Sequence, residues 1–282
     1  MPSQSSNPKI NNECGDELKH TMYREVSVAP FKVSIEAFYN KFWAAGKYGS
    51  AATNDDECAR AGAIVAALHY CGILPHVSGN RTVLDVGCGR GWLTALLSDF
   101  GCVVGIDPVS AGPIRARELF PKIDFRIADT DTLIKEGGAA TFDIVVSSEV
   151  IEHIHSAAQN RFFQDLFTLL KPGGCAVLTT PRGELWEWYK AHGNGFQPVE
   201  AWIFENDLQE MARTAGFQVL VQRRIFVGGY PYCTPARLLG VRHWRQCVRV
   251  LSRLSLIRRV VDHFGIYQIL GLKRPGNRGD TI

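Results

Sequence analysis

The chain has 282 residues, 46% of them hydrophobic, which is enough to bury the core of one α/β domain with additions or of two smaller domains. Its formal net charge of +3 is too small to indicate a nucleic-acid partner by itself. The eight cysteines include no CxxC pair, which argues against a zinc motif or a disulfide framework and favours reduced thiols in a cytoplasmic protein. The best apolar run, 62–74, is about 13 residues long, too short to span a bilayer.

The first part of the chain is expected to be a tail followed by helices. Residues 1–30 are polar and contain no apolar signal core, so we expect a disordered tail. Aromatic residues spaced through Phe31–Gly46 predict an amphipathic helix. A second helix is predicted over Asn54–Cys71, with acidic residues at its start and Gly72 at its end. We therefore expect a helical cap over 31–75.

Strand patterns alternate with helical patterns over the rest of the chain. Helical segments begin near Trp92, Pro113 and Ala157, and another is predicted over Glu205–Ala215. This alternation predicts a parallel sheet wrapped by helices, so residues 76–282 are expected to form one domain. The predicted strands are Thr82–Val86, Val103–Ile106, Asp124–Ile127, Asp143–Ser147, Cys175–Thr180, Phe217–Phe226 and Tyr267–Lys273.

The most informative stretch is VLDVGCGRGW, 83–92, in which an apolar strand breaks into three glycines. In an open parallel sheet, ligands bind beyond the carboxyl ends of the strands, where the winding reverses. A dinucleotide fingerprint would need glycine in place of Trp92, and a P-loop would need a GK[ST] ending, which is absent. Instead, Asp85 precedes the glycines, and Asp107 ends the next strand, where a carboxylate can accept two hydrogen bonds from a ribose diol.

Together with four further motifs, this stretch resembles the class I S-adenosylmethionine-dependent methyltransferases. The matching pieces, in the family's order, are VLDVGCGRG (83–91), VVGIDP (103–108), FRIADTDTL (125–133), FDIVVSSEVIEHI (142–154) and LLKPGGCAVLTTP (169–181). Within the family, the chain is most similar to ubiquinone-type O-methyltransferases and their small-molecule relatives. The resemblance implies an α/β fold with a Rossmann-like seven-stranded sheet, mostly parallel with an antiparallel last strand, flanked by helices.

The resemblance also implies which residues bind S-adenosyl-L-methionine. Bare glycine backbone would admit the methionine portion of the cofactor. Asp85 would hold its amino group, and Asp107 its ribose. Asp129 with Thr130 would contact its adenine. The complete set of cofactor-binding candidates is Asp85, Gly87, Cys88, Gly89, Gly91, Asp107, Asp129 and Thr130.

The family places the transferring methyl group after the fourth strand, where the sequence reads SEVIEHIH (148–155). The catalytic candidates are Glu149, Glu152 and His153, whose spacing would put them on one face of a helical turn. In one interpretation, His153 is a general base that takes a proton from a hydroxyl. In another, the three side chains hold Mg²⁺ or a transition metal, as the same ExxEH string does in small-RNA 3′-terminal methyltransferases.

That metal arrangement uses a further histidine, and His192 is the one candidate for it, in a context that does not match well. A third interpretation is that the glutamate cages the cofactor while His153 packs locally.

The aromatic stretch ELWEWYKAHGNGFQPVEAWIF (184–204) would either wall an aromatic or isoprenoid acceptor or fill the core of a long loop.

An insertion over 227–265 separates the last two predicted strands, which plain members of the fold join by a short connection. Within 236–264, seven arginines accompany one acidic residue and are interleaved with leucine and valine. A basic amphipathic helix of this kind lies on an anionic membrane, holds a phosphorylated or nucleic-acid partner, or caps the core. We expect peripheral membrane contact through 236–264, and we do not expect a nucleic-acid partner.

The sequence therefore predicts a cytoplasmic S-adenosylmethionine-dependent methyltransferase, peripheral to a membrane. It would move a methyl group to a hydroxyl of a small-molecule or lipid-linked acceptor. RNA 2′-O-methylation is one alternative. The other is a catalytically silent module that binds adenosylmethionine.

Overall fold

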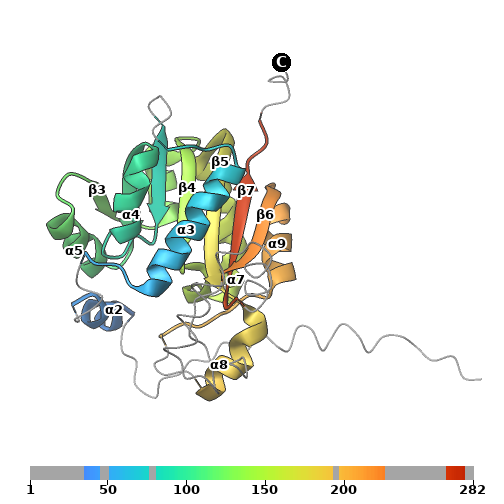
Figure 1. Ribbon diagram of the computed structural model, residues 1–282. Coiled ribbons are helices and arrows are strands. Elements are labelled where there is room, and N and C mark those ends of the chain that lie inside the picture. Colours follow the sequence, from blue (N-terminus) through green and yellow to red (C-terminus); the bar gives the residue numbers. More distant parts are fainter. Residues whose placement is uncertain (1–34, 45–50, 76–80, 193–196, 226–264, 277–282) are drawn as a thin grey trace, which may run out of the picture.

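The computed structural model describes residues 35–44, 51–75, 81–192, 197–225 and 265–276, which contain one seven-stranded sheet (Figure 1). The strand order is β3-β2-β1-β4-β5-β7-β6. β1 to β5 pair in parallel, and β7 runs antiparallel to both of its neighbours, β5 and β6. This confirms the predicted Rossmann-like sheet. The strands are β1 (Thr82–Val86), β2 (Cys102–Asp107), β3 (Asp124–Ile127), β4 (Phe142–Ser148), β5 (Leu170–Pro181), β6 (Gln218–Ile225) and β7 (Tyr267–Lys273).

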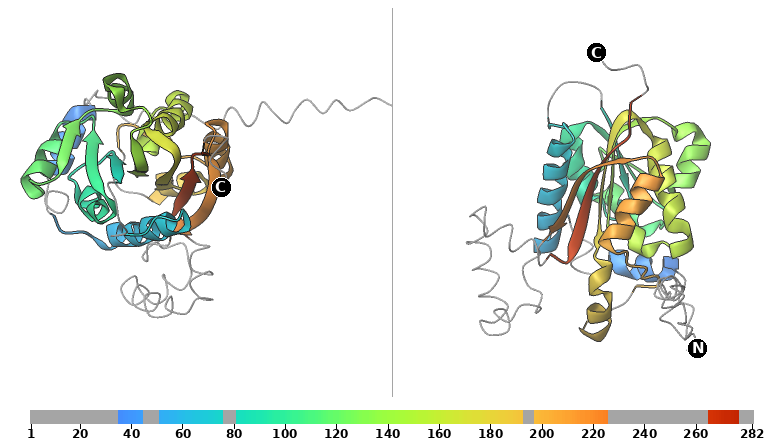
Figure 2. Two further views of the ribbon diagram at one scale, coloured as in Figure 1. Left: turned by 90° about the horizontal axis from the view of Figure 1, so that it is seen from above. Right: turned by 90° about the vertical axis from the view of Figure 1, so that its right-hand side faces the viewer.

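Helices cover both faces of the sheet, as the side view in Figure 2 shows. α3 and α4 pack on one face, and α7 and α9 pack on the other. Successive strand residues point to opposite faces, so Val83 joins the core cluster under α3 and Leu84 joins the one under α7. The helices are α2 (Ile35–Ala44), α3 (Asp55–Tyr70), α4 (Trp92–Leu97), α5 (Ala111–Leu119), α6 (Thr130–Leu133), α7 (Ser156–Leu169), α8 (Trp186–His192) and α9 (Glu205–Thr214).

The predicted strands are all present, with small differences at their ends. β5 differs most, because it begins at Leu170 rather than at Cys175. The register between β4 and β5 shifts after the first pair: Phe142 pairs with Leu170, and the regular ladder begins only with Ile144 and Cys175, so the extra residues lie in β5. The KPGG segment that follows Leu170 reads as a turn in the sequence, so the pattern gives no sign of this early pairing.

α3 begins where the sequence predicts, at a capping box. The Asn54 side chain accepts a hydrogen bond from the Glu57 backbone amide at 2.9 Å, and the Glu57 carboxylate accepts one from the Asn54 amide at 2.9 Å. The apolar face of α3, which includes Ile64 and Leu68, packs into one of the two core clusters of the sheet. α3 is therefore part of the layer that covers the sheet, and a separate helical cap over 31–75 stays a prediction.

β1 lies between β2 and β4, so the winding of the sheet reverses beside it. α2 and α8 lie beyond the edge of the sheet where the parallel strands end (Figure 1). The predicted tail and nearly all of the predicted basic insertion over 227–265 lie outside the described residues. Among the helices that the structure describes, none is both long and apolar enough to cross a membrane.

Candidate active site

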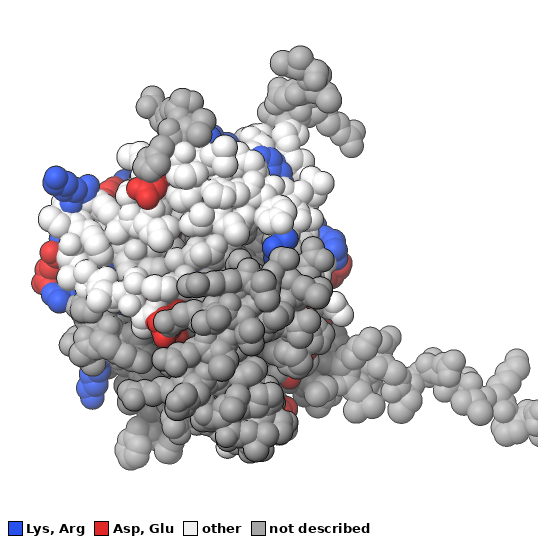
Figure 3. Space-filling model, in the orientation of Figure 1, with Lys and Arg blue, Asp and Glu red and all other residues white. Residues whose placement is uncertain are grey.

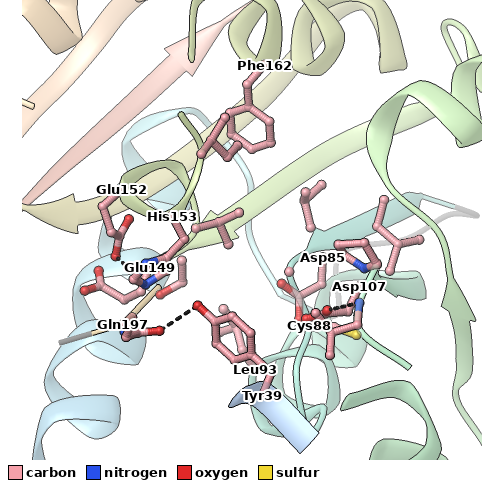
Figure 4. Close-up of a pocket in the computed structure, with 18 of the residues that line it drawn as sticks. Tyr39, Asp85, Cys88, Leu93, Asp107, Glu149, Glu152, His153, Phe162 and Gln197 are labelled. Atoms are coloured by element: carbon pink, nitrogen blue, oxygen red, sulfur yellow. Dashed lines mark hydrogen bonds and ion pairs between the residues drawn. The ribbon is translucent and has the colours of Figure 1, made fainter. Parts of the chain in front are cut away.

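A cavity of about 920 Å³ lies at the carboxyl edge of the sheet, beside the loops after β1, β2 and β4. Figure 4 shows Tyr39 of α2 between two groups of side chains in it. We term them the β1–β2 side (Asp85, Cys88 and Asp107) and the β4 side (Glu149, Glu152 and His153). Nine of the predicted site residues line the cavity: Asp85, Gly87, Cys88, Asp107, Asp129, Thr130, Glu149, Glu152 and His153.

The predicted glycines after β1 are needed for backbone conformation and for close packing. Gly87, Gly89 and Gly91 have φ angles of +76°, +47° and +81°, in the left-handed region that side chains disfavour. A Cβ atom on Gly87 would lie 2.2 Å from Val150 Cγ2, and one on Gly89 would lie 2.6 Å from the Trp43 ring. The bare backbone thus admits side chains from the β4 loop and from α2. Its contact with a cofactor stays a prediction.

Two buried carboxylates end β1 and β2 at the cavity. Asp85 is 1% exposed and accepts a hydrogen bond from the Thr94 hydroxyl at 2.6 Å. Asp107 accepts backbone hydrogen bonds from Gly89 at 3.1 Å and from Val109 at 2.9 Å, so it joins the loops after both strands. Burial raises the pKa of Asp85 to about 7 and the pKa of Asp107 to about 6. A ligand that brings N–H or O–H donors would favour the charged form of both groups.

Changing Asp107 to asparagine is expected to weaken S-adenosylmethionine binding by about 2–3 kcal/mol, or roughly 30- to 150-fold, because hydrogen bonds to a charged acceptor are lost. The affinity of the unchanged protein should also fall as the pH is lowered through about 6, where this carboxylate takes up a proton. Calorimetric titration measures both effects. Asp99→Asn, on the exposed surface after α4, is the matched control. Equal affinities of the two variants would contradict the ribose contact of Asp107.

Asp129 and Thr130 stand where α6 begins, after β3. The Asp129 carboxylate caps α6 by accepting a hydrogen bond from the Thr132 amide at 2.8 Å, and the bonds to Thr132 lower its pKa. The Thr130 hydroxyl donates to Asp165 at 2.8 Å, so its oxygen is left as an acceptor. Both residues therefore present acceptors to the cavity, which suits the amino group of an adenine.

The predicted catalytic residues do not share one face of a helix, so that part of the prediction is wrong. β4 ends in a sharp turn in which Glu149 has a φ angle of +60°, and only the short 3-10 helix η4 (Ile151–His153) follows. The two glutamates are held instead by adjacent threonines of β5. Thr179 donates to Glu149 at 2.9 Å, and Thr180 donates to Glu152 at 2.9 Å. Burial raises the pKa of both carboxyl groups to about 8.

The His153 ring is oriented by the chain that crosses the β4 side. Its Nδ1 lies 3.0 Å from the Val199 carbonyl oxygen, which can only accept a hydrogen bond. In the neutral ring, Nδ1 therefore carries the hydrogen and Nε2 keeps its lone pair. Nε2 lies 3.7 Å from Glu152 Oε1, which is longer than a hydrogen bond. His153 thus offers an unprotonated nitrogen at the cavity wall, as a general base requires.

The metal interpretation finds no ligand set in the part of the chain that the structure describes. There, no group of three or more His, Cys, Asp or Glu side chains is placed to hold a metal ion, and this includes the trio Glu149, Glu152 and His153. One oxygen of each glutamate instead accepts a hydrogen bond from a threonine of β5. The side chain of His192, the candidate fourth ligand, lies outside the described part.

Residues that the motifs did not identify complete the wall of the cavity. The Tyr39 hydroxyl donates a hydrogen bond to Gln197 Oε1 at 2.6 Å, and the Tyr39 and His153 rings meet with centroids 6.3 Å apart. Glu200 is 7% exposed and accepts hydrogen bonds from the Gln197 amide at 3.1 Å and from Trp202 Nε1 at 2.7 Å. The aromatic pattern around Tyr39 predicted a helix but no site. Glu200 lies in the aromatic stretch 184–204 that is expected to wall an acceptor or to fill the core of a loop, but no pattern there singles out its carboxylate.

Comparisons with known proteins agree with this arrangement. A family model described as a methyltransferase domain matches residues 55–222, which is more than half of the chain. A probable S-adenosylmethionine-dependent methyltransferase of Mycolicibacterium smegmatis is 32% identical over 157 residues, which cover 55% of this chain and 59% of that protein. The chain therefore belongs to the S-adenosylmethionine-dependent methyltransferase family.

A second curated relative matches a shorter part of the chain, and one solved structure matches most of it. The mitochondrial ubiquinone biosynthesis O-methyltransferase of Rattus norvegicus is 40% identical over 112 residues, which cover 37% of this chain and 31% of that protein. The chain thus spans less than two thirds of the length of these curated relatives. The solved complex of the Haloferax volcanii Trm112 methyltransferase activator with the putative methyltransferase has a chain that matches with a TM-score of 0.56 at 20% identity, covering 84% of this chain and 97% of that chain. That likeness shows the fold alone.

Proposed function

We propose that the protein transfers a methyl group from S-adenosyl-L-methionine to a hydroxyl group of a small-molecule or lipid-linked acceptor. The observation that carries this proposal is His153, whose Nε2 meets no hydrogen-bond donor among the described residues and lies at the cavity wall. The partial matches to ubiquinone biosynthesis O-methyltransferases of Rattus norvegicus and Homo sapiens support oxygen as the receiving atom.

The β1–β2 side has groups that suit this cofactor. When bound, S-adenosyl-L-methionine supplies an electrophilic methyl group on a positively charged sulfur. Asp85 would accept hydrogen bonds from its amino group and Asp107 from its ribose hydroxyls, since both are buried acceptors at the ends of neighbouring strands. The acceptor atoms of Asp129 and Thr130 would receive the adenine amino group. The donor and acceptor chemistry of these residues therefore fits the cofactor.

On the β4 side, His153 Nε2 would take the hydroxyl proton as the acceptor oxygen attacks the methyl carbon. The bond from Nδ1 to the Val199 carbonyl would hold the ring in place. Glu152 Oε1, 3.7 Å from Nε2, would stabilise the imidazolium that forms. Alignment of the two reacting centres would supply most of the rate, with proton removal as the smaller contribution. The Tyr39 ring, whose centroid lies 6.3 Å from that of His153, would help to keep water from the reacting groups.

Two alternatives are RNA 2′-O-methylation and a catalytically silent module that binds adenosylmethionine. RNA 2′-O-methylation requires a basic surface that follows the phosphate backbone. On the described part of the face in Figure 3, Lys and Arg are scattered among Asp and Glu toward the margins. The arginines within 236–264 lie outside the described residues, so peripheral membrane contact through them remains a proposal from the sequence. A catalytically silent module would not require an oriented base at His153.

The test is to incubate the protein with S-adenosylmethionine and panels of phenols, alcohols, amines, lipid-linked hydroxyl compounds and short RNAs. S-adenosylhomocysteine formation is measured, and the position of the new methyl group is determined by mass spectrometry. We expect turnover with hydroxyl compounds and an O-methyl product. Methyl groups found only on nitrogen or on ribose would contradict the proposal, and cofactor binding without turnover on any panel would favour the silent module.

A further inference from the structure

On the β4 side of the cavity, two hydrogen-bond acceptors lie near each other: Glu152 Oε1 and His153 Nε2. Glu152 has a side chain only 2% exposed, and its Oε2 accepts a hydrogen bond from Thr180. Its Oε1 lies 3.7 Å from His153 Nε2. Because Nδ1 of that ring donates to Val199, Nε2 is also an acceptor. Neither of these two atoms donates a hydrogen bond to the other, and a ligand that carries donors would bond to both.

The charge of the cavity wall indicates which donor is favoured. Ten carboxylates and three arginines line the cavity in the described residues. Arg60 lies 3.5 Å from Glu149, Arg90 pairs with Glu57, and Arg161 pairs with Asp165, so each of these arginines already faces a carboxylate. An anionic ligand group would therefore meet an excess of carboxyl groups, whereas a cationic one would be attracted to them and would favour the charged form of Glu152, which burial disfavours.

Aromatic rings border the same region. The Trp202 and Tyr189 rings line the cavity with centroids 4.8 Å apart, and Trp202 Nε1 donates to Glu200 at 2.7 Å. The segment that carries Glu200 and Trp202 lies directly against η4, because the Ala201 backbone amide donates a hydrogen bond to the Glu152 carbonyl oxygen at 2.7 Å. A carboxylate beside aromatic faces is a favourable environment for an ammonium group.

We propose that the methyl acceptor binds as a cation: a hydroxyl-bearing amine with its hydroxyl at His153 Nε2 and its ammonium group toward Glu152 and Glu200, beside Trp202. This inference rests on the proposed function, since it assigns the acceptor to the β4 side. It differs from what the arginines within 236–264 indicate, which is attraction of an anionic partner. Whether a cationic or an anionic acceptor binds more tightly therefore distinguishes the two interpretations.

The experiment uses three probes that share a phenol ring and differ in the charge of the side chain: tyramine, tyrosol and 4-hydroxyphenylacetate. Their affinities for the full chain saturated with S-adenosylhomocysteine are measured by calorimetry. We expect tyramine to bind at least about tenfold more tightly than the acid, with tyrosol between them. Glu200→Gln, which removes charge and keeps shape, is expected to reduce the ratio between amine and acid severalfold. Glu187→Gln, an exposed carboxylate on α8, is the matched control and should leave it unchanged.

Several outcomes would overturn the inference. One is an affinity for tyramine equal to or below that for the acid, including no detectable binding of either. Another is a change in S-adenosylmethionine affinity in Glu200→Gln without any change in the ratio, which would show that the carboxylate serves the cofactor instead. The proposed function is judged separately, by methyl transfer to the phenol oxygen. Selective binding of the amine with no O-methyl product would support the cationic site and contradict the reaction.

Discussion

The variant His153→Ala is expected to lower kcat by roughly 10²- to 10⁴-fold while leaving the affinity for S-adenosylmethionine nearly unchanged. The reason is that Nε2 is the unprotonated nitrogen on the β4 side, while the residues expected to bind the cofactor lie on the β1–β2 side. Initial rates of S-adenosylhomocysteine formation measure kcat, and calorimetry measures cofactor affinity.

The matched control is His155→Ala, which removes an exposed histidine that stands at the start of α7 and does not line the cavity. We expect this variant to keep full activity. The assay is repeated with EDTA and with added Mg²⁺, and we expect no effect of either. Loss of activity in EDTA that Mg²⁺ restores would support the metal interpretation instead. Full activity of His153→Ala without metal would leave neither role for this residue.

The variant Arg90→Met is expected to lower the free energy of unfolding by about 3–5 kcal/mol, because it leaves the Glu57 carboxylate buried without its partner. Arg90 is 1% exposed, and its guanidinium donates to both Glu57 oxygens at 2.8 Å and to the Ala52 carbonyl at 3.1 Å. Glu57 also closes the capping box of α3, so the pair ties the glycine loop after β1 to the start of that helix. Urea denaturation followed by circular dichroism measures the change.

A second variant separates the buried charge from lost packing. Glu57→Gln combined with Arg90→Met removes both charges and keeps a side chain that can still close a capping box. If the uncompensated carboxylate causes the loss, the double variant should be more stable than Arg90→Met alone. Arg115→Met, on the exposed face of α5 beside Glu118, serves as a surface control and should change stability by less than about 1 kcal/mol. Equal stability of Arg90→Met and the control would show that the pair contributes little.

Features with a local cause were readable before the structure. The acidic residues near its start and Gly72 at its end predicted α3, and the structure shows that a local capping box between Asn54 and Glu57 begins it. The strands β1 and β4 read as apolar runs because both of their faces are covered by helices. The glycine turn after β1 was recognisable because a left-handed backbone selects glycine. The helical turn expected at Glu149 is absent, because this residue has a left-handed backbone with a φ angle of +60°. No glycine stands there, so the sequence gives no indication of a left-handed residue.

The order of strands and helices, the glycine loop, and the acids at the ends of β1 and β2 can be predicted from the amino-acid sequence, because they follow from periodicity and from single-residue backbone preferences. Which groups share the cavity depends on the tertiary fold. The Tyr39–Gln197 hydrogen bond joins residues 158 apart in the chain, and Arg90 reaches Glu57 across 33 residues. The tautomer of His153 likewise depends on the carbonyl of Val199, from a segment beyond β5. Such contacts form only when packing against the sheet brings distant segments together, so no local pattern records them.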